Sequence, residues 1–425
     1  MAPQTHTKGI PKVVVLGGGF AGLESAYYLK WRLKNKVDIT IVSDRPNFLF
    51  KPNTIYIPFG MEPEKLMFPL DKTAAKAGVK FKLARAEEID PTSKIVRTSE
   101  GDISYDFLVV ATGAKMRPEE IPGMQENAQT IFTPAEMLKL RAAYNALLEN
   151  AKAGQQQTVR FLVPPNNKCS GPLYEMVFML DTWLRRNKVR DRVAINYATF
   201  EKGYIQAFGP RLNVHVEEEF AKRGIHGDKE HVIASIAADH ARFTNGAELP
   251  HDLLVSFPPY AAATPFAGLP MDDRGFIATE MASRQVVGFP DIYAAGDTGD
   301  FPVKQAFLAF LQGDAVAESL ASRILGNKAA IGFEPMSMCV MEQLDRATFA
   351  QVPLRLTGNP ALPVEVPQEA YGDYKMGNSS IWRLGKKMLG FYLPWRFRNG
   401  KPFHAGLPWK GMELGLKAMS GVLAG

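Results

Sequence analysis

The chain has 425 residues, of which 46% are hydrophobic and 22% charged, proportions that are ordinary for a globular protein. These values exclude a disordered or fibrous chain, and the length is enough for two or three domains with separate cores. No run approaches the roughly 18 apolar residues of a membrane-spanning helix, and residues 1–12 lack the apolar segment of a signal peptide, so neither is expected.

Positive charge is concentrated at the carboxyl end of the sequence. The net charge is +6, but residues 375–425 contain nine Lys or Arg and one acid, Glu413, a net +8 that leaves the remainder at −2. A basic excess confined to one end does not make the whole chain a nucleic-acid binder, and no nucleic acid is expected as a partner. The two cysteines, Cys169 and Cys339, form no CxxC pair, and no Cys/His cluster has metal-ligand spacing, so no metal site is expected.

A glycine-rich turn follows the first predicted strand. Residues 13–16 are a short apolar run typical of a buried strand, and residues 21–33 have helical periodicity. Between them Gly17, Gly19 and Gly22 form G-x-G-x-x-G. The first glycine permits a tight turn, the second lets a pyrophosphate approach the backbone, and the third lets helix pack on strand. The segment therefore predicts a dinucleotide-binding turn.

After a second predicted strand, residues 37–42, the position that often carries an acid for the ribose hydroxyls is Ser43, with Asp44 next to it. The sequence does not decide which of the two contacts the adenosine ribose.

Two later segments, YDFLVVATGA at 105–114 and DIYAAGD at 291–297, turn this pattern into a family resemblance. They resemble the ATG and GD segments of the flavoprotein disulfide reductase superfamily, in which the aspartate, here Asp297, binds the ribitol of FAD. The resemblance implies FAD as cofactor. The residues expected to contact it are Gly17, Gly19, Phe20, Ala21, Gly22, Ser43, Asp44, Lys51, Ala86, Ala111, Thr112, Gly113, Gly296, Asp297, Lys304 and Gln305.

The resemblance also predicts the fold class and the domains. The class is α/β, with two Rossmann-like dinucleotide-binding domains in tandem and a carboxyl-terminal amphipathic region. The predicted divisions are 1–125 and 288–335 for a discontinuous FAD domain, 126–287 for a second Rossmann-like domain, and 336–425 for a quinone- and membrane-binding region.

The second Rossmann-like unit lacks a nucleotide turn. After the predicted strand at 158–163, Pro164 and Pro165 occupy the turn and offer no backbone N–H to a pyrophosphate. NADH therefore has no evident cradle. Cys169 lies at the same turn, before a predicted helix from Gly171, and the helix dipole with Lys168 beside it leads us to expect a thiolate.

The stretch CSGPLYE at 169–175 resembles the C-x-G-x-x-[YF]-E segment of sulfide:quinone oxidoreductases, and FPPY at 257–260, RGFI at 274–277 and VKQAF at 303–307 extend the resemblance over nearly the whole chain. It implies that Cys169 and Cys339 form a redox pair, which oxidises hydrogen sulfide to polysulfide or sulfur with FAD and passes electrons to a membrane quinone.

The resemblance further implies that Lys304 stabilises reduced flavin and that Glu175 relays protons, although a simple pairing of this carboxylate remains open. Many family members have a third cysteine near 131–133, and this chain has none. Schemes that need three cysteines are excluded, and FAD is expected without a thioether because residues 48–52 contain no cysteine.

The carboxyl-terminal region mixes aromatic, apolar and basic residues from about 380, and a second amphipathic segment spans 407–423. We expect both to bind an anionic membrane surface, as a peripheral protein of the prokaryotic cell membrane, with a packed helix pair as the alternative. Phe391 and Tyr392 are expected to flank the quinone ring.

Three other readings stay open: a type II NADH:quinone dehydrogenase, a non-enzymatic scaffold and a cytochrome-linked sulfide dehydrogenase. The quinone type, the polysulfide length, the membrane face and the oligomeric state, including a homo-oligomer, are left undecided.

Overall fold

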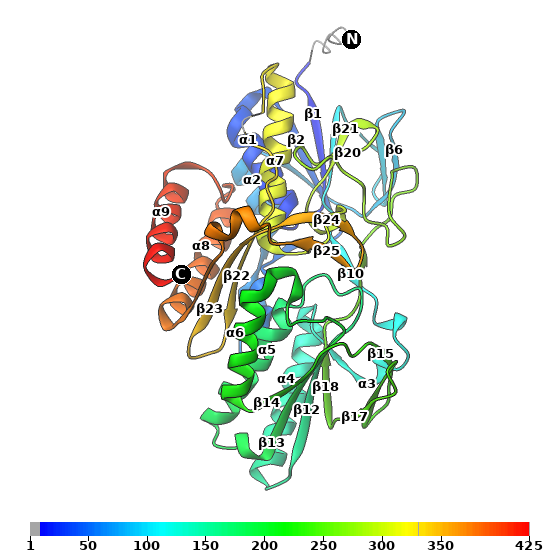
Figure 1. The fold of residues 1–425 in the computed structure, drawn as a ribbon. Coiled ribbons are helices and arrows are strands. Elements are labelled where there is room, and N and C mark those ends of the chain that lie inside the picture. The colour runs from blue at the N-terminus through cyan, green and yellow to red at the C-terminus, as the bar shows by residue number, and fades with distance from the viewer. Residues whose placement is uncertain (1–8, 330, 425) are drawn as a thin grey trace.

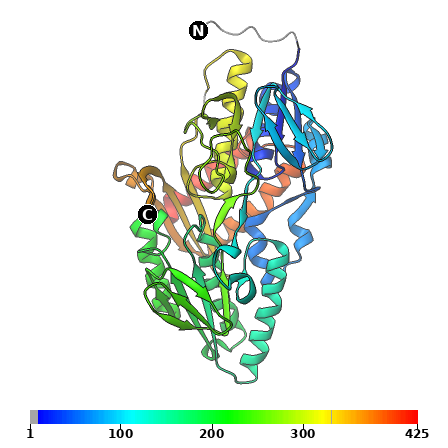
Figure 2. The ribbon, with the colours of Figure 1, turned by 90° about the vertical axis from the view of Figure 1, so that its right-hand side faces the viewer.

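The computed structural model describes residues 9–329 and 331–424. The expectation about a signal peptide at 1–12 falls largely on residues 1–8, which lie outside the described residues. The molecule is elongated, with one sheet-containing unit above the other and a carboxyl-terminal layer along one side (Figures 1 and 2).

The first unit is built on a six-stranded sheet in the order β20-β21-β9-β1-β2-β5. Its strands are parallel apart from the β20–β21 pair. The strands span Gln285–Val286 (β20), Phe289–Ala294 (β21), Phe107–Val110 (β9), Lys12–Leu16 (β1), Asp38–Ser43 (β2) and Lys80–Leu83 (β5). β9 is buried throughout, as expected for a parallel strand covered on both faces. One sheet thus joins segments nearly 200 residues apart in the sequence.

Helices α1 (Phe20–Leu33) and α7 (Ala306–Leu325) pack together beside this sheet (Figure 1). Glycine allows their close contact, because a Cβ on Gly313 of α7 would lie 3.1 Å from the Ala21 carbonyl oxygen of α1. Smaller elements complete the unit: α2 (Leu70–Ala77), the pair β3 (Asn47–Leu49) and β4 (Met67–Pro69), and the sheet of β6 (Ala86–Asp90), β7 (Ile95–Thr98) and β8 (Ile103–Ser104).

The second unit has a five-stranded parallel sheet in the order β11-β18-β12-β13-β14. Its strands span Gln129–Thr130 (β11), Leu253–Ser256 (β18), Gln157–Val163 (β12), Val193–Thr199 (β13) and Ile225–Asp228 (β14). Its helices are α4 (Pro134–Lys152), α5 (Gly171–Arg186) and α6 (Gly209–Arg223), with a short α3 (Met124–Asn127). Thr133 and Glu136 form a capping box that fixes the start of α4. The sheet of β15 (Ile233–Ile236), β16 (His240–Phe243) and β17 (Glu248–Pro250) lies at its edge.

A two-stranded antiparallel link connects the two units. β10 (Ala114–Met116) follows the first unit's β9, and β19 (Tyr260–Ala262) follows the second unit's β18. The α/β class with two Rossmann-like units is therefore confirmed. The exact domain boundaries stay a prediction.

The carboxyl-terminal layer begins with an antiparallel sheet of β22 (Met336–Glu342), β23 (Ala347–Pro353) and β26 (Lys375–Ser379), with a hairpin of β24 (Arg355–Asn359) and β25 (Leu362–Glu365). Helices α8 (Ser380–Arg398) and α9 (Gly406–Leu423) follow. The Ser379 hydroxyl caps α8 by accepting from the Trp382 N–H. The Trp382 ring stacks on Phe349 with centroids 4.0 Å apart, which fixes the helix on the sheet.

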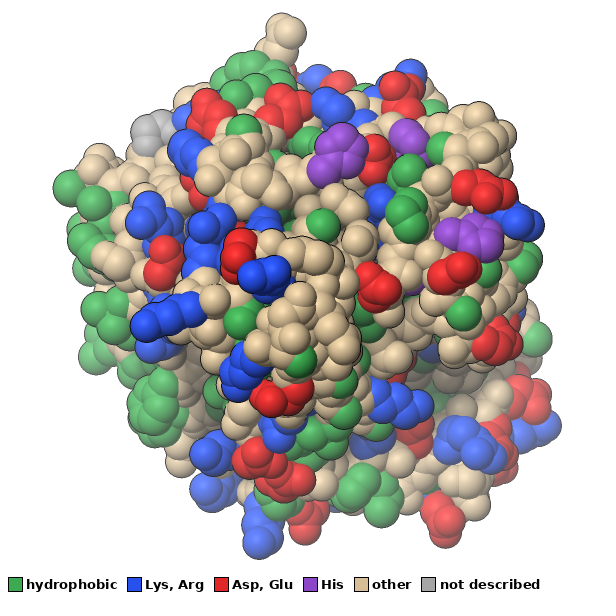
Figure 3. Space-filling model, turned by 90° about the horizontal axis from the view of Figure 1, so that it is seen from below, with side chains coloured by type: hydrophobic (Ala, Val, Ile, Leu, Met, Phe, Trp, Pro, Cys, Tyr) green, Lys and Arg blue, Asp and Glu red, His purple; other side chains and the backbone are tan. Residues whose placement is uncertain are grey.

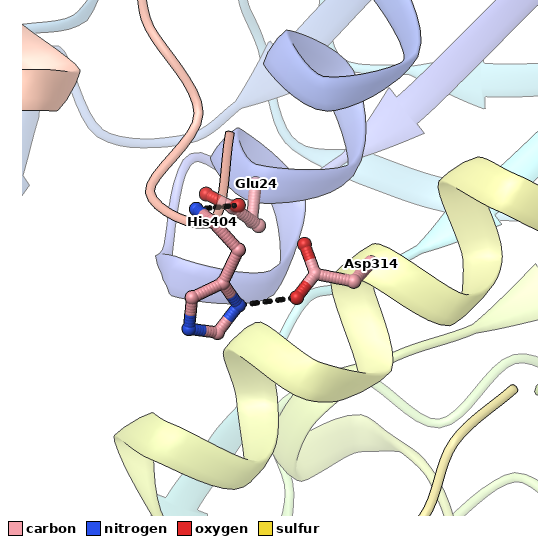
Figure 4. A group of neighbouring side chains, drawn as sticks. All are labelled: Glu24, Asp314 and His404. Atoms are coloured by element: carbon pink, nitrogen blue, oxygen red, sulfur yellow. Dashed lines mark hydrogen bonds and ion pairs between the residues drawn. The ribbon is translucent and has the colours of Figure 1, made fainter. Parts of the chain in front are cut away.

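The loop between α8 and α9 is anchored in the first unit by buried polar groups (Figure 4). Glu24 of α1 accepts the backbone N–H of Phe403 at 2.6 Å and that of His404 at 3.0 Å. His404 Nδ1 also pairs with Asp314 of α7. Burial raises the pKa of Asp314 and lowers the pKa of His404, so burial disfavours the charged form of both partners in this contact.

Arg396 completes the anchor by donating to the carbonyl oxygens of Pro402 at 2.9 Å and Ala405 at 2.6 Å. Glu24, Asp314 and His404 offer ligand atoms within 4.8 Å of one another, but the described contacts use these groups to hold the loop. The anchor therefore ties the carboxyl-terminal layer to α1 and α7.

Candidate active site

A cavity of about 1370 Å³ lies between the two units and the carboxyl-terminal layer. It opens at the carboxyl ends of strands from both sheets, where open α/β sheets bind their ligands. The strand-end residues that line it are Leu16, Ser43, Ala111, Val163, Phe200, Phe257 and Ala295. Its volume exceeds the roughly 1,000 Å³ upper range of small-molecule pockets, so it has room for a dinucleotide and a second ligand.

The turn after β1 has the shape that a dinucleotide requires. Gly17 has φ +114, and a Cβ there would lie 2.2 Å from the Ala111 carbonyl oxygen. A Cβ on Gly22 would lie 2.0 Å from the Gly17 carbonyl oxygen, whereas one on Gly19 meets nothing within 4 Å. No side chain caps the start of α1, so its first N–H groups remain available to a pyrophosphate.

The GD segment and the VKQAF segment after it place an acid, Asp297, and a lysine, Lys304, at the same cavity. Burial raises the pKa of Asp297, while Lys304 and Lys51 nearby act to lower it. Lys304 is itself buried, donates to the Gly299 carbonyl oxygen, and has its pKa lowered to about 7 by burial. These groups suit the ribitol and isoalloxazine of FAD, since a lysine there can supply positive charge when the flavin becomes anionic.

The other residues expected to contact FAD also lie at this cavity, with one exception. The lining includes Gly17, Gly19, Phe20, Ala21, Ser43, Asp44, Lys51, Ala86, Ala111, Thr112, Gly113, Gly296, Asp297, Lys304 and Gln305. Gly22 is not in the lining, because it packs against the Gly17 backbone. Ser43 and Asp44 both reach the cavity, so the choice between them at the ribose stays open. Arg45, which the sequence did not single out, lines it too.

The turn after β12 is built differently and presents a thiol. Asn166 has φ +62, and the side chain of Asn167 accepts from the Cys169 N–H at 2.9 Å and donates to the Phe257 carbonyl oxygen at 2.8 Å. Pro164 and Pro165 supply no N–H group. The turn is therefore braced by its own side chain, and it holds Cys169 two residues before α5.

Cys169 and Cys339 line the same cavity and both are only partly exposed. A Cβ on Gly171, at the start of α5, would lie 3.8 Å from the Cys339 sulfur, so β22 brings Cys339 against that helix start. The Cys339 thiol is close enough to raise the pKa of Cys169. The fold therefore brings together cysteines 170 positions apart in the sequence.

The ionisation of Cys169 differs from the expectation of a thiolate. Burial raises the pKa of Cys169, and Cys339, Asp297 and Glu175 raise it further. Burial also raises the pKa of Cys339 to about 12. The helix start and Lys168 do not offset the loss of water and the surrounding acids, so both reduced cysteines are thiols at neutral pH.

A buried ion pair lies next to Cys339. Glu175 of α5 forms an ion pair with Lys386 of α8, and it accepts the Glu342 N–H at 2.8 Å. Lys386 also donates to the Val340 carbonyl oxygen at 2.6 Å. Burial raises the pKa of Glu175, and Lys386 opposes this rise. Lys386 was missed by sequence reasoning, because only the packing of α8 on β22 shows that this lysine faces inward.

The structure does not bring Phe391 and Tyr392 to the cavity. Phe391 is 74% exposed, and Tyr392 is buried against Phe403, with ring centroids 5.7 Å apart. The residues of α8 and of the loop after it that line the cavity are instead Lys386, Leu389, Gly390, Leu393 and Phe403. The first four recur at helical spacing on one face of α8, and Phe391 falls on the opposite face.

Comparison with known proteins agrees with this architecture. The family described as pyridine nucleotide-disulphide oxidoreductase matches residues 11–149. The chain is 34% identical over 222 residues to the sulfide-quinone reductase of Aquifex aeolicus, an alignment that covers 50% of this chain and 49% of that relative. It is 23% identical over 377 residues to the mitochondrial sulfide:quinone oxidoreductase of Dictyostelium discoideum, covering 86% of this chain and 82% of the relative.

The X-ray structure of the sulfide:quinone oxidoreductase from Aquifex aeolicus has the same fold, with a TM-score of 0.82, 24% identity and 96% coverage of both chains. The cradle after β1, Asp297 and the family match together define an FAD-dependent flavoprotein of the pyridine nucleotide-disulphide oxidoreductase class. Within that class the chain is similar in sequence to sulfide-quinone reductases and shares the fold of one of them.

Proposed function

We propose that this protein oxidises hydrogen sulfide to polysulfide or sulfur through Cys169, Cys339 and FAD, and passes the electrons to a quinone. The observation that carries the proposal is that both cysteines line the cavity that holds the flavin cradle. Because the chain has no other thiol, the sulfur chemistry falls to this pair.

The cysteines perform the sulfur chemistry by thiol–disulfide exchange. Hydrosulfide attacks one sulfur of an oxidised Cys169–Cys339 pair, the bond between the cysteines breaks, and a bond from the substrate sulfur to one cysteine forms while the other leaves as thiolate. Attack by a second hydrosulfide on the bound sulfur releases HSS⁻, so the balance is two HS⁻ giving HSS⁻, one proton and two electrons. FAD held in the cradle after β1 would supply the two-electron acceptor that restores the oxidised cysteine pair, and a quinone would take up those electrons.

The buried Glu175–Lys386 pair offers a place for the released proton. It lies beside Cys339 and connects α5 to α8, whose face lines the cavity near Leu389 and Leu393. Burial raises the pKa of Glu175, so this carboxylate takes up a proton more readily than an exposed one. A proton accepted there lies between the thiols and the apolar end of the cavity, which suits the ring and tail of a quinone.

Anaerobic titration of the FAD-loaded protein tests the proposal. Sulfide is expected to bleach the flavin, and a short-chain quinone is expected to restore its absorbance. The alternative activity, a type II NADH:quinone dehydrogenase, is the outcome if NADH bleaches the flavin and sulfide does not.

We further propose that α8 and α9 dock on a membrane surface, as a peripheral protein of a prokaryotic cell membrane. None of the helices in residues 9–329 and 331–424 has the length and hydropathy needed to cross a bilayer. Apolar side chains gather along the edge of the molecule on which these helices lie, with Lys and Arg beside them (Figure 3). The exposed apolar residues of the two helices are Ile381, Leu384, Met388, Phe391, Trp395, Leu407, Leu414 and Val422.

Surface substitutions test docking better than removal of the helices, because deleting α8 would leave the buried carboxylates of Glu175 and Glu342 without Lys386 and Arg383. The double variant Phe391→Ser, Leu407→Ser is expected to lose vesicle binding and turnover of a long-chain quinone, while sulfide still reduces its flavin. The matched control, Leu138→Ser with Val214→Ser, changes two exposed apolar residues of the second unit and is expected to behave as wild type. Equal vesicle binding by both double variants would contradict docking through α8 and α9.

A further inference from the structure

A hollow of about 270 Å³ lies apart from the active-site cavity, at the edge of the first unit. It forms where the end of α1, the end of α2 and the loop after α8 meet. Four lysines line it, Lys30, Lys34, Lys76 and Lys401, together with Tyr27 and Trp31. Among the residues that the structure describes, no carboxylate lines the hollow.

The lysine charges are not neutralised by neighbouring acids. In the part of the chain that the structure describes, none of the four forms a salt bridge, whereas Arg32 on the same helix pairs with Glu318. Lys76 donates to the Arg398 carbonyl oxygen at 3.1 Å, and Lys30 lies 3.5 Å from that of Val37. Carbonyl oxygens carry no net charge, so the hollow keeps an excess of about four positive charges that would attract an anion.

Lysines often interact with the last carbonyl groups of a helix, and this accounts for part of the cluster. Lys30 lies in the last turn of α1, and Lys76 in the last turn of α2. Lys401 belongs to neither helix, and it reaches the hollow from a loop more than 300 residues later in the sequence. Helix capping therefore does not explain why three separate segments direct lysines into one space.

The loop that carries Lys401 is held tightly against α2. Gly400 has φ +62, and a Cβ there would lie 2.4 Å from the Ala77 nitrogen, so only glycine allows this approach. The same loop continues into Phe403 and His404, which Glu24 anchors. The position of Lys401 beside the other lysines is thus fixed by backbone contacts.

The hollow adjoins the proposed membrane-docking helices, because its third wall is the loop between α8 and α9. Trp31, at its rim, is 47% exposed. Exposed tryptophan and lysine side by side are typical of the membrane–water interface, where the indole lies among headgroups and the ammonium meets phosphate.

We propose that this hollow binds the phosphate of an anionic phospholipid headgroup, and so orients the protein on its membrane. The inference rests on the proposed docking of α8 and α9, to which it adds a defined site for the headgroup of an anionic lipid. The lysine ammonium groups would hold the phosphate, and Trp31 would lie against the glycerol region of the lipid.

The test measures binding of the full-length, FAD-loaded protein to phosphatidylcholine vesicles with and without phosphatidylglycerol. Wild type is expected to prefer the anionic vesicles. The variant Lys34→Gln, Lys401→Gln is expected to lose that preference by on the order of 10-fold while still binding phosphatidylcholine. The control Lys139→Gln, Lys188→Gln removes the same charge from exposed positions of the second unit, and it should keep the preference.

Two further measurements separate the outcomes. Flavin reduction by sulfide and the thermal midpoint should be unchanged in the lysine variants, which shows that they fold. Failure of docking is expected in the Phe391→Ser, Leu407→Ser variant, which should lose binding to both kinds of vesicle. Failure of headgroup recognition is expected in the lysine variant, which should lose only the preference for anionic vesicles. An unchanged preference in Lys34→Gln, Lys401→Gln overturns the proposal. The proposal is also overturned if inorganic phosphate binds the protein in solution and Lys34→Gln, Lys401→Gln removes that binding but keeps the anionic vesicle preference, because the site would then be one for free phosphate.

Discussion

The turns after β1 and β12 occupy equivalent places in two similar units but have opposite chemistry. After β1, three glycines leave backbone exposed and the start of α1 uncapped. After β12, two prolines remove N–H groups, Asn167 braces the turn, and the Cys169 thiol lies at the turn, two residues before α5. The same strand–turn–helix arrangement thus binds the cofactor in one unit and positions a cysteine in the other.

The comparison teaches that the residues of the turn, and not the fold, decide what each unit does. In each unit, the parallel strands of the sheet direct the turn toward the same cavity. Glycine residues allow the turn after β1 to bind a pyrophosphate. Proline and asparagine residues make the turn after β12 rigid, and this rigid turn holds the Cys169 thiol in place.

The largest expected effect comes from the thiols. Cys169→Ala and Cys339→Ala should each abolish flavin reduction by sulfide, because the chain has no third thiol to replace either one. FAD should remain bound, since neither residue belongs to the glycine turn. Anaerobic stopped-flow absorbance of the flavin checks this, with Ser170→Ala as a control at the same turn. Full sulfide-driven reduction in Cys339→Ala would show that the cysteines do not act as a pair.

A second prediction concerns the nucleotide that the second turn cannot hold. NADH should reduce the flavin at least ~10²-fold more slowly than sulfide, because two missing charge-assisted hydrogen bonds to a pyrophosphate cost about 1.5–3 kcal/mol each. The same stopped-flow assay with NADH as reductant measures it. Comparable rates for the two reductants would mean that the second unit binds pyridine nucleotide without a glycine turn.

Sequence reasoning reached the parts of the site that depend on local backbone chemistry. The glycine turn, the ATG and GD segments and the pair of cysteines could be read from short motifs, and all of them lie at one cavity. Properties that depend on tertiary contacts could not be predicted from the sequence. Lys386 faces inward only because α8 packs on β22, and Phe391 lies on the outer face of that helix. The raised pKa of Cys169 comes from burial and distant acids, which no local pattern reveals.

A third prediction separates two glycines of the first turn. Gly22→Ala should destabilise the protein, because its Cβ would lie 2.0 Å from the Gly17 carbonyl oxygen. Gly19→Ala should leave the FAD-free fold intact, since nothing lies within 4 Å of its Cβ, but it should weaken FAD binding about 10- to 100-fold by filling the pyrophosphate site. Thermal unfolding without cofactor and FAD titration measure the two effects. A Gly19→Ala variant with normal FAD affinity would place the pyrophosphate elsewhere.

The smallest expected effect concerns the acid that follows the second strand of the second unit. In the first unit this place is held by Ser43 and Asp44, and in the second by Glu201, two residues beyond β13; all three line the cavity. The carboxylate of Glu201 accepts from the Thr199 hydroxyl at 3.1 Å and from the Gln206 N–H at 2.9 Å. Its oxygens are therefore engaged in local structure and do not present a free carboxylate to a ribose.

Burial raises the pKa of Glu201 to about 7, from an ordinary value of 4.5. The folded protein therefore binds more protons than the unfolded chain between pH 4.5 and 7, and its stability should fall as the pH rises through this window. The loss should be about 2 kcal/mol, after allowance for the partial exposure of the side chain. Glu201→Gln, which cannot ionise, should lack this component, whereas Glu218→Gln at an exposed position should retain it. Urea unfolding at pH 5 and pH 8 measures the difference. If Glu201→Gln loses as much stability as wild type between these pH values, then Glu201 is ionised throughout this range. Its carboxylate would then be free to act as a ligand group, as in the first unit. The two units would differ only in the turns after β1 and β12.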